Sequence, residues 1–177
     1  MLSTRINSGT HKGKILVLPP QTVTRAVTAK VRASIFNKLE VDGVRVLDLY
    51  AGGGTLGFEA LSCGASSVTF VDRADKSIEA LKKNAQSLGL TSKVSIKKSD
   101  VLKYCHNLGL KYDIVFLDPP YRQFNNTLVK TASNLVQLGG ILVVSCSSKS
   151  VLSPSDELEL IAEKTYGDTK IAYLKKV

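Results

Sequence analysis

The chain has 177 residues, which fits one main domain of roughly 150 residues with a small appendage. Hydrophobic residues make up 44% and charged residues 22%, with 13 glycines and 5 prolines, and these proportions exclude collagen-like, low-complexity and disordered chains. The formal net charge is +9, and most of it falls in residues 1–40, which hold seven Lys or Arg and a single acid, Glu40. This asymmetry favours a polyanionic partner, because each neutralised phosphate releases counterions.

The apolar residues and the cysteines indicate the compartment. No apolar stretch approaches the roughly 18 residues of a membrane span, and charges stand where a signal peptide would carry its apolar block. We therefore expect a cytoplasmic protein without membrane contact. The widely spaced Cys63, Cys105 and Cys146 and two isolated histidines predict free thiols and no metal site.

The N-terminal twenty residues predict a separate arm. Short extended segments at 3–8 and 14–18 flank a glycine-containing turn, and Pro19 and Pro20 follow them. We expect residues 1–20 to form a basic β-hairpin outside the main domain.

The main domain, 21–177, is predicted to alternate strands and helices. It begins with an amphipathic helix over 28–39, which Thr28 caps. The alternation that follows predicts a doubly wound, mostly parallel α/β sheet with helices on both faces, and residues 157–177 resemble a final antiparallel hairpin. The expected strands are 44–50, 67–72, 94–98, 113–117 and 141–146, and the expected helices are 55–63, 76–88, 101–108 and 125–135.

A glycine loop joins the first strand of this sheet to the next helix. Gly52, Gly54 and Gly57 match the pattern G-x-G-x-x-G, in which glycine permits a tight turn and close approach of a ligand to the backbone. Three interpretations fit the loop: a dinucleotide site, an S-adenosylmethionine site, or a tight strand-to-helix turn.

Acidic residues near the strand ends help to separate the two cofactors. Asp48, four residues before Gly52, would repel a pyrophosphate but would favour the sulfonium and ammonium groups of S-adenosylmethionine. Asp72 could accept hydrogen bonds from both hydroxyls of a ribose, which would serve either cofactor. Asp100 could accept one from an adenine amino group, or it could cap a helix.

The most specific motif follows the strand 113–117. Asp118, Pro119, Pro120 and Tyr121 leave the sheet as a stiff rim, because proline fixes its own φ and keeps the preceding residue extended. A carboxylate and a backbone carbonyl on this rim could accept both N–H bonds of an exocyclic amine and direct its lone pair toward a methyl donor. Tyr121 would stack on an unpaired or flipped base. The alternative is a proline-rigid turn with a packed tyrosine.

Together these residues resemble the RsmD family of Rossmann-like, S-adenosylmethionine-dependent methyltransferases, which act on bacterial small-subunit ribosomal RNA. The resemblance spans nearly the whole chain. It is carried by Arg5-Ile6, Gly13-Lys14, Val31-Arg32, Ile35 to Asn37, Asp48 to Gly52, Leu56 to Ser62 and Phe116 to Tyr121.

The resemblance implies transfer of a methyl group to the N2 amine of one guanine in 16S rRNA, either free or in the small ribosomal subunit. We expect the protein to act as a monomer. The family's usual Arg-Pro-Thr is replaced here by Arg25, Ala26 and Val27. The implied residues are Asp118, Pro119, Pro120 and Tyr121 for catalysis, Thr28, Asp48, Ala51, Gly52, Gly54, Asp72 and Asp100 for the donor, and Arg5, Lys12, Lys14 and Arg25 for RNA.

Other functions remain open on the sequence. The rim suits any conjugated amine, so adenine N6 or a protein glutamine could be the acceptor. An NAD-linked oxidoreductase would share the glycine loop but leaves the Asp-Pro-Pro-Tyr motif unexplained. The altered Ala26 and Val27 also allow an RNA-binding homologue with weakened catalysis.

Overall fold

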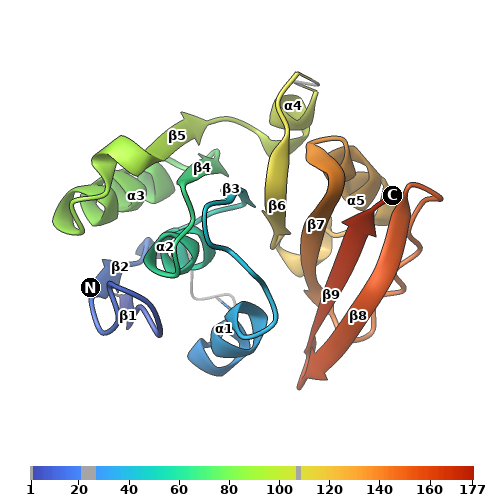
Figure 1. The fold of residues 1–177 in the computed structure, drawn as a ribbon, viewed down its shortest axis with the longest axis horizontal. Helices are drawn as coiled ribbons and strands as arrows, with labels where there is room; N and C mark the ends of the chain where they lie inside the picture. The colour runs from blue at the N-terminus through green and yellow to red at the C-terminus, as the bar shows by residue number, and fades with distance from the viewer. Residues whose placement is uncertain (1, 21–26, 107–108) are drawn as a thin grey trace.

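The computed structural model describes residues 2–20, 27–106 and 109–177. A seven-stranded sheet runs through the molecule in the order β5-β4-β3-β6-β7-β9-β8 (Figure 1). Strands β3 to β7 are parallel, and β9 and β8 complete the sheet in antiparallel pairs. The strands are β3 (Arg45–Leu49), β4 (Ser67–Asp72), β5 (Val94–Lys98), β6 (Tyr112–Leu117), β7 (Val136–Ser147), β8 (Leu158–Tyr166) and β9 (Thr169–Lys176).

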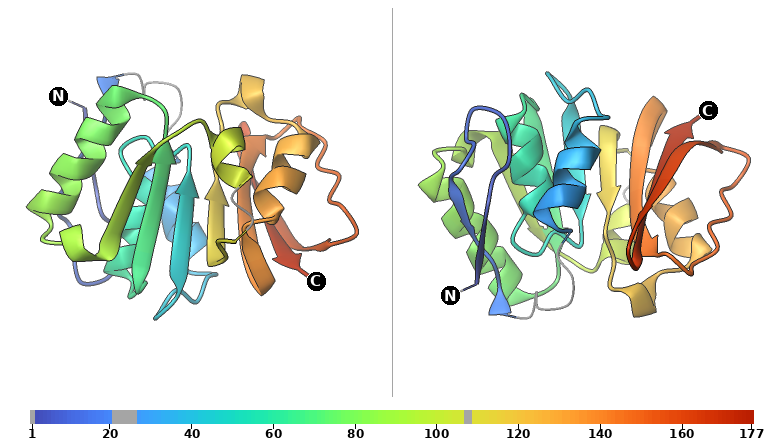
Figure 2. Two further views of the ribbon diagram at one scale, coloured as in Figure 1. Left: turned by 90° about the horizontal axis from the view of Figure 1, so that it is seen from above. Right: turned by 90° about the horizontal axis from the view of Figure 1, so that it is seen from below.

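Helices cover both faces of this sheet, because successive residues of the central strands are apolar and point to opposite sides. On β3, Val46 joins a core cluster with α1, α2 and α3, whereas Leu47 joins a second cluster with α4 and α5. Figure 2 shows the helices on the two sides in its two views. The helices are α1 (Ala29–Phe36), α2 (Thr55–Ser62), α3 (Asp75–Ser87), α4 (Val101–Cys105) and α5 (Asn126–Ser133), with short 3-10 turns η2 (Thr91–Lys93) and η3 (Tyr121–Gln123).

The predicted fold class is therefore confirmed, including the C-terminal antiparallel hairpin of β8 and β9. Several predicted elements differ in length, among them the helix predicted at 125–135, which spans Asn126–Ser133. The strand predicted at 141–146 begins at Val136, since β7 continues through an irregularity opposite Tyr112 to Ile114 and a left-handed Gly139. The α1 helix stops at Phe36 and α4 at Cys105, while residues 107–108 of the predicted 101–108 helix lie outside the described residues.

The N-terminal hairpin forms its own two-stranded sheet from β1 (Ser3–Arg5) and β2 (Ile15–Val17). Its apolar residues Ile6 and Leu16 are 2% and 1% exposed and belong to the same core cluster as α1 and α2. The backbone of Val17 also exchanges hydrogen bonds of 2.8 and 2.9 Å with the Asn84 side chain of α3. The arm therefore shares the core of the main domain.

Among the described residues, no helix has the length and apolar character needed to cross a membrane.

Candidate active site

The candidate site lies where β3, β4 and β6 end. After β3 the chain adds β4 and β5 on one side of β3, and it then returns to add β6 on the other side. Doubly wound sheets bind ligands in the crevice at such a change of direction. In register, Leu49 pairs with both Val71 and Leu117, so the residues that follow these three strands meet at one edge. Asp72 and Asp118 lie at this edge, and Asp48 lies beneath it in β3.

Asp48 is turned inward at the base of the glycine loop. Its carboxyl is 2% exposed and accepts a 3.0 Å hydrogen bond from the Gly57 amide in the first turn of α2. Burial raises the pKa of Asp48 well above its usual value, the Gly57 hydrogen bond opposes the rise, and Asp118 and Asp72 add repulsion. Asp48 thus occupies part of the helix terminus to which a pyrophosphate would bind.

The loop above Asp48 has an unusual backbone. Gly52 and Gly54 have φ values of 54° and 78°, which glycine adopts without strain, and Gly54 begins α2. Tyr50 also has a positive φ, 59°, although it carries a side chain. Strain of this kind gathers at ligand sites, and it adds Tyr50 to the site residues that the glycine pattern identified.

Asp72 and Asp100 both make local hydrogen bonds. Asp72 accepts from Gly52 and from Ala74, each at 2.9 Å, and so ties the glycine loop to the turn after β4. Asp100 accepts from Lys103 at 3.2 Å and caps α4, which confirms the capping alternative. Each ionised carboxylate has about four acceptor positions, so both retain capacity for a ligand's hydroxyl or amino groups.

Asp118 follows β6 directly and is only partly exposed. Burial raises the pKa of its carboxyl to about 6, and a hydrogen bond with Ser145 opposes this rise. Asp48, Asp72 and Asp118 therefore place acidic groups close enough to repel one another. Such a cluster suits a cationic ligand, because a positive charge would relieve both the burial and the repulsion.

The predicted rim is present after Asp118. Pro119 is buried and Pro120 is exposed, and the Pro120 carbonyl accepts the Gln123 amide at 2.7 Å, which closes the η3 turn. Tyr121 begins this turn, and its hydroxyl lies 2.6 Å from the Thr169 hydroxyl of β9.

A pocket of about 580 Å³ opens beside this rim. Its walls come from the start of α1, from the rim and Ser145, and from the turn between β8 and β9. Thr28 lies in the α1 wall and caps that helix through a 3.4 Å hydrogen bond from Val31, as predicted. The lining residues are Val27, Thr28, Lys30, Val31, Tyr121, Ser145 and Thr165 to Thr169.

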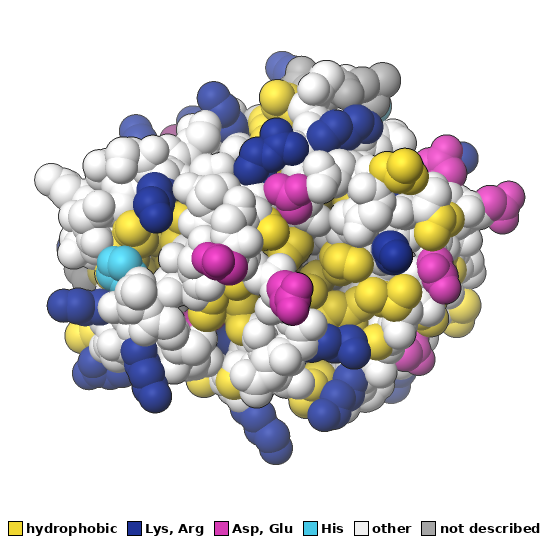
Figure 3. Space-filling model, viewed as in Figure 1, with side chains coloured by type: hydrophobic (Ala, Val, Ile, Leu, Met, Phe, Trp, Pro, Cys, Tyr) yellow, Lys and Arg dark blue, Asp and Glu magenta, His cyan; other side chains and the backbone are white. Residues whose placement is uncertain are grey.

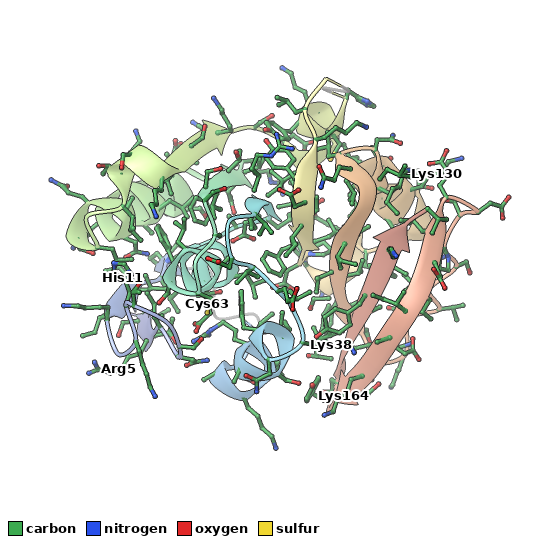
Figure 4. All side chains as sticks on the ribbon, in the orientation of Figure 1. Arg5, His11, Lys38, Cys63, Lys130 and Lys164 are labelled. Atoms are coloured by element: carbon green, nitrogen blue, oxygen red, sulfur yellow. The ribbon has the colours of Figure 1, made fainter. Side chains whose placement is uncertain are left out.

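The predicted RNA-binding residues of the arm lie on its surface. Lys12 and Lys14 are exposed, and Arg5 is exposed while donating a 2.8 Å hydrogen bond to the Gly13 carbonyl. Figure 3 shows Lys and Arg side chains along the lower edge of the face in view, over the hairpin, α1 and the ends of β8 and β9. Figure 4 places Arg5 on the arm and Lys164 at the opposite end of this edge. Arg25 lies outside the described residues.

A buried network connects the arm to the helices around the site. Glu59 of α2 is fully buried and accepts hydrogen bonds of 2.8 to 3.0 Å from the amides of Asn7 and Ser8. Its carboxylate also lies 3.6 Å from the guanidinium of Arg32 in α1, which donates to the Arg5 carbonyl at 2.8 Å. No local pattern indicates this role of Glu59, because the two amides that it accepts from are more than fifty residues away in the chain.

Comparison with known proteins identifies the family. A family model described as conserved hypothetical protein 95 matches residues 4–175. The chain belongs to this family, the RsmD-type methyltransferases. YlbH of Bacillus subtilis, provisionally named an rRNA methyltransferase, is 35% identical over 181 residues, which cover 97% of this chain and 98% of that protein.

Two further proteins resemble this chain, one in sequence and one in fold. The ribosomal RNA small subunit methyltransferase D of Haemophilus influenzae is 32% identical over 175 residues, 92% of this chain and 89% of that protein. The structure of YhhF from Escherichia coli, provisionally named a methyltransferase, matches with a TM-score of 0.90 at 24% identity, covering 99% of this chain and 98% of that one. The RsmD-type fold predicted from the sequence is thus confirmed.

Proposed function

We propose that this RsmD-type protein transfers a methyl group from S-adenosylmethionine to the exocyclic N2 amine of a guanine in 16S rRNA. The observation that carries the proposal is the rim that follows β6, on which Tyr121 lines a pocket and Asp118 lies close enough to repel Asp48 at the base of the glycine loop. The names of the relatives, which include a ribosomal RNA small subunit methyltransferase, support the RNA class of the substrate.

The residues of the glycine-loop site fit S-adenosylmethionine. Asp48 and the neighbouring acids favour its cationic methionine end, Asp72 has acceptor capacity for the ribose hydroxyls, and Asp100 for the adenine amine. The backbone of Ala51 to Gly54 allows close approach, and Thr28 lies in the α1 wall of the pocket beside the rim. An NAD-type pyrophosphate fits less well, because the Asp48 carboxyl already holds the Gly57 amide.

When bound, the cofactor supplies an electrophilic methyl group on a positively charged sulfur. Asp118 accepts one N–H of the target amine, and a rim carbonyl accepts the other, which holds the nitrogen lone pair toward the donor. The Pro120 carbonyl is already bonded to Gln123, so Pro119 is the rim residue whose carbonyl takes this role. Tyr121 stacks on the flipped base, and Asp118 can hold the proton that the methylated nitrogen releases.

The decisive experiment uses the purified protein, labelled S-adenosylmethionine and 16S rRNA from a strain that lacks the gene. We expect one N2-methylguanosine per RNA, identified by mass spectrometry of the digested nucleosides. N6-methyladenosine, or label in a ribosomal protein instead, would redirect the proposal to one of the other conjugated amines. RNA binding without affinity for the donor would indicate the catalytically weakened homologue.

Asp118→Ala tests the assigned chemistry. Loss of the acceptor should lower turnover by at least about a hundredfold, since positioned acid–base groups contribute 10² to 10⁴. Donor affinity, measured by calorimetry, should fall far less than turnover, because Asp118 is one of three acids near the donor but supplies the carboxylate that accepts the target amine. Asp156→Ala, which removes an exposed carboxylate, serves as the control. Unimpaired turnover in Asp118→Ala would contradict the mechanism.

A further inference from the structure

Two hydroxyl groups from the C-terminal half of the sheet contact the two rim side chains. Ser145 of β7 lies beside Asp118 at the neighbouring strand end and lowers the pKa of its carboxyl through a hydrogen bond, and the Thr169 hydroxyl at the start of β9 lies 2.6 Å from that of Tyr121. Both hydroxyl residues also line the pocket. They come from strands that follow the rim in the chain and carry no motif of their own.

We propose that Ser145 and Thr169 are positioning residues, which hold the Asp118 carboxylate and the Tyr121 ring in the orientation that the target base requires. This inference rests on the proposed function and adds to it two residues that act through the rim.

The sheet register explains the first contact. Leu117 pairs with Val144 in the parallel β6–β7 ladder, so the residues that follow them, Asp118 and Ser145, are neighbours at the strand ends. Ser145 is 5% exposed and therefore has little freedom to turn toward solvent. An ionised carboxylate can only accept, so the Ser145 hydroxyl donates and stabilises the ionised form of Asp118. This is the form that accepts an amine N–H.

The second contact fixes the far end of the Tyr121 side chain. Rotation about the Cα–Cβ bond of Tyr121 would carry its hydroxyl away, so a hydrogen bond of 2.6 Å at that hydroxyl restrains this rotation. The strand that carries Thr169 is itself held in place, because Tyr166 on the other side of the turn bonds to Ser34 of α1. The hydrogen bond thereby holds the ring of Tyr121 at the pocket wall.

Other charged groups lie near Asp118 and the pocket. Asp118 raises the pKa of Asp48 in β3 by repulsion, and Asp168 in the β8–β9 turn places a negative group in the pocket wall. Lys30 of α1 contributes a positive charge to the same wall. Ser145 is the hydroxyl that bonds to the Asp118 carboxyl directly, so its removal should have a distinct effect on the pH profile.

The first test is the pH dependence of methyl transfer to 16S rRNA by the full chain. Because the pKa of Asp118 is raised to about 6, wild-type activity should fall as the pH drops through this value. Ser145→Ala should move this acid limb upward by about one pH unit, an approximately fivefold loss at pH 6, with donor affinity unchanged. Ser147→Ala, on the same strand but bonded to the Lys149 amide, should keep the wild-type profile.

The second test separates a positioning role from a packing role at Thr169. Thr169→Val should raise the KM for RNA roughly tenfold, since part of the stacking contact is lost, and should leave the acid limb in place. Thr169→Ser should restore the wild-type KM because it keeps the hydroxyl. Tyr121→Phe and Thr169→Val each remove one hydroxyl of the same hydrogen bond. In the double variant, the increases in the KM for RNA caused by the two single substitutions should therefore not add.

The outcomes distinguish the two levels of the proposal. If the wild-type protein transfers no methyl group to rRNA, the proposed function fails. If it does, and the Ser145→Ala profile superimposes on the wild type or Thr169→Ser loses as much as Thr169→Val, the positioning inference is overturned. Should Ser145→Ala not fold, Ser145→Cys preserves the volume with a weaker donor and must show the same upward shift, reduced in size.

Discussion

At Gly57 the backbone of α2 approaches the sheet more closely than any side chain would allow. A Cβ at this position would lie 2.2 Å from Cε1 of Phe70 and 2.8 Å from Cγ1 of Val68. The close approach brings the Gly57 amide to Asp48, and this contact holds the glycine loop against the end of β3. The third glycine of the motif therefore serves packing and orients the loop.

Gly57→Ala should accordingly destabilise the protein by about 1 to 3 kcal/mol, the usual cost of overpacking a core. The measurement is the free energy of unfolding in urea. Gly109→Ala is the matched control, because a Cβ there meets no atom of the described residues within 4 Å, and it should change the stability by less than about 0.5 kcal/mol. Equal stability of the two variants would show that the overlap is relieved without cost.

At the scale of elements, the arm, α1 and α2 are joined through one buried ion pair. Burial lowers the pKa of Arg32 and Glu59 opposes this change, so each partner compensates for the burial of the other. The carboxylate also satisfies the Asn7 and Ser8 amides, which would otherwise lack this acceptor. Since α1 forms one wall of the pocket, the network fixes the distance between that wall and the glycine loop.

Removal of one partner should be far more costly than removal of a surface ion pair. We expect Glu59→Ala to lower the free energy of unfolding by about 3 to 5 kcal/mol, because it leaves a buried guanidinium without its counter-ion and two amides without their acceptor. Glu79→Ala, which breaks an exposed 3.2 Å pair with Lys76, should cost less than about 1 kcal/mol. Thermal and urea unfolding measure both, and comparable losses would disprove the importance of the network.

At the scale of the whole molecule, charge is separated between the site and its surroundings. Acidic groups gather at the ends of β3, β4 and β6, while Arg5, Lys12 and Lys14 are exposed on the arm. This arrangement suits a cationic donor within the crevice and a polyanionic acceptor across its rim. Deletion of the arm would not test the second part, because Ile6 and Leu16 belong to the core.

Charge substitution on the folded arm is the suitable experiment. Replacing Lys12 and Lys14 by serine should weaken binding to 16S rRNA and reduce the slope of log K against log salt by about 0.7 to 0.9 for each lysine that contacts a phosphate. The pair Lys82 and Lys83 on α3 is exposed to the same degree and provides a control with equal loss of charge. The arm has no role in RNA binding if the two double variants show the same slope.

Much of the architecture was predictable because its causes are local. The apolar strands, the breakers between them and the cap at Thr28 gave the order of strands and helices, and β4 and β5 begin and end where predicted. The acids at the strand ends could also be assigned to one edge, since parallel strands all end on the same side of a sheet. The capping alternative for Asp100 was resolved only by its contact with Lys103.

The sequence by itself determined the fold class and the family and predicted the acidic and proline-rich residues of the site, because periodicity and short motifs are properties of neighbouring residues. Only the tertiary structure decided what those residues contact. The inward turn of Asp48 onto Gly57, the burial of Glu59 against the arm, and the contacts of Ser145 and Thr169 with the rim depend on strand order and register. These are set by packing between segments distant in the chain, on which local patterns carry no information.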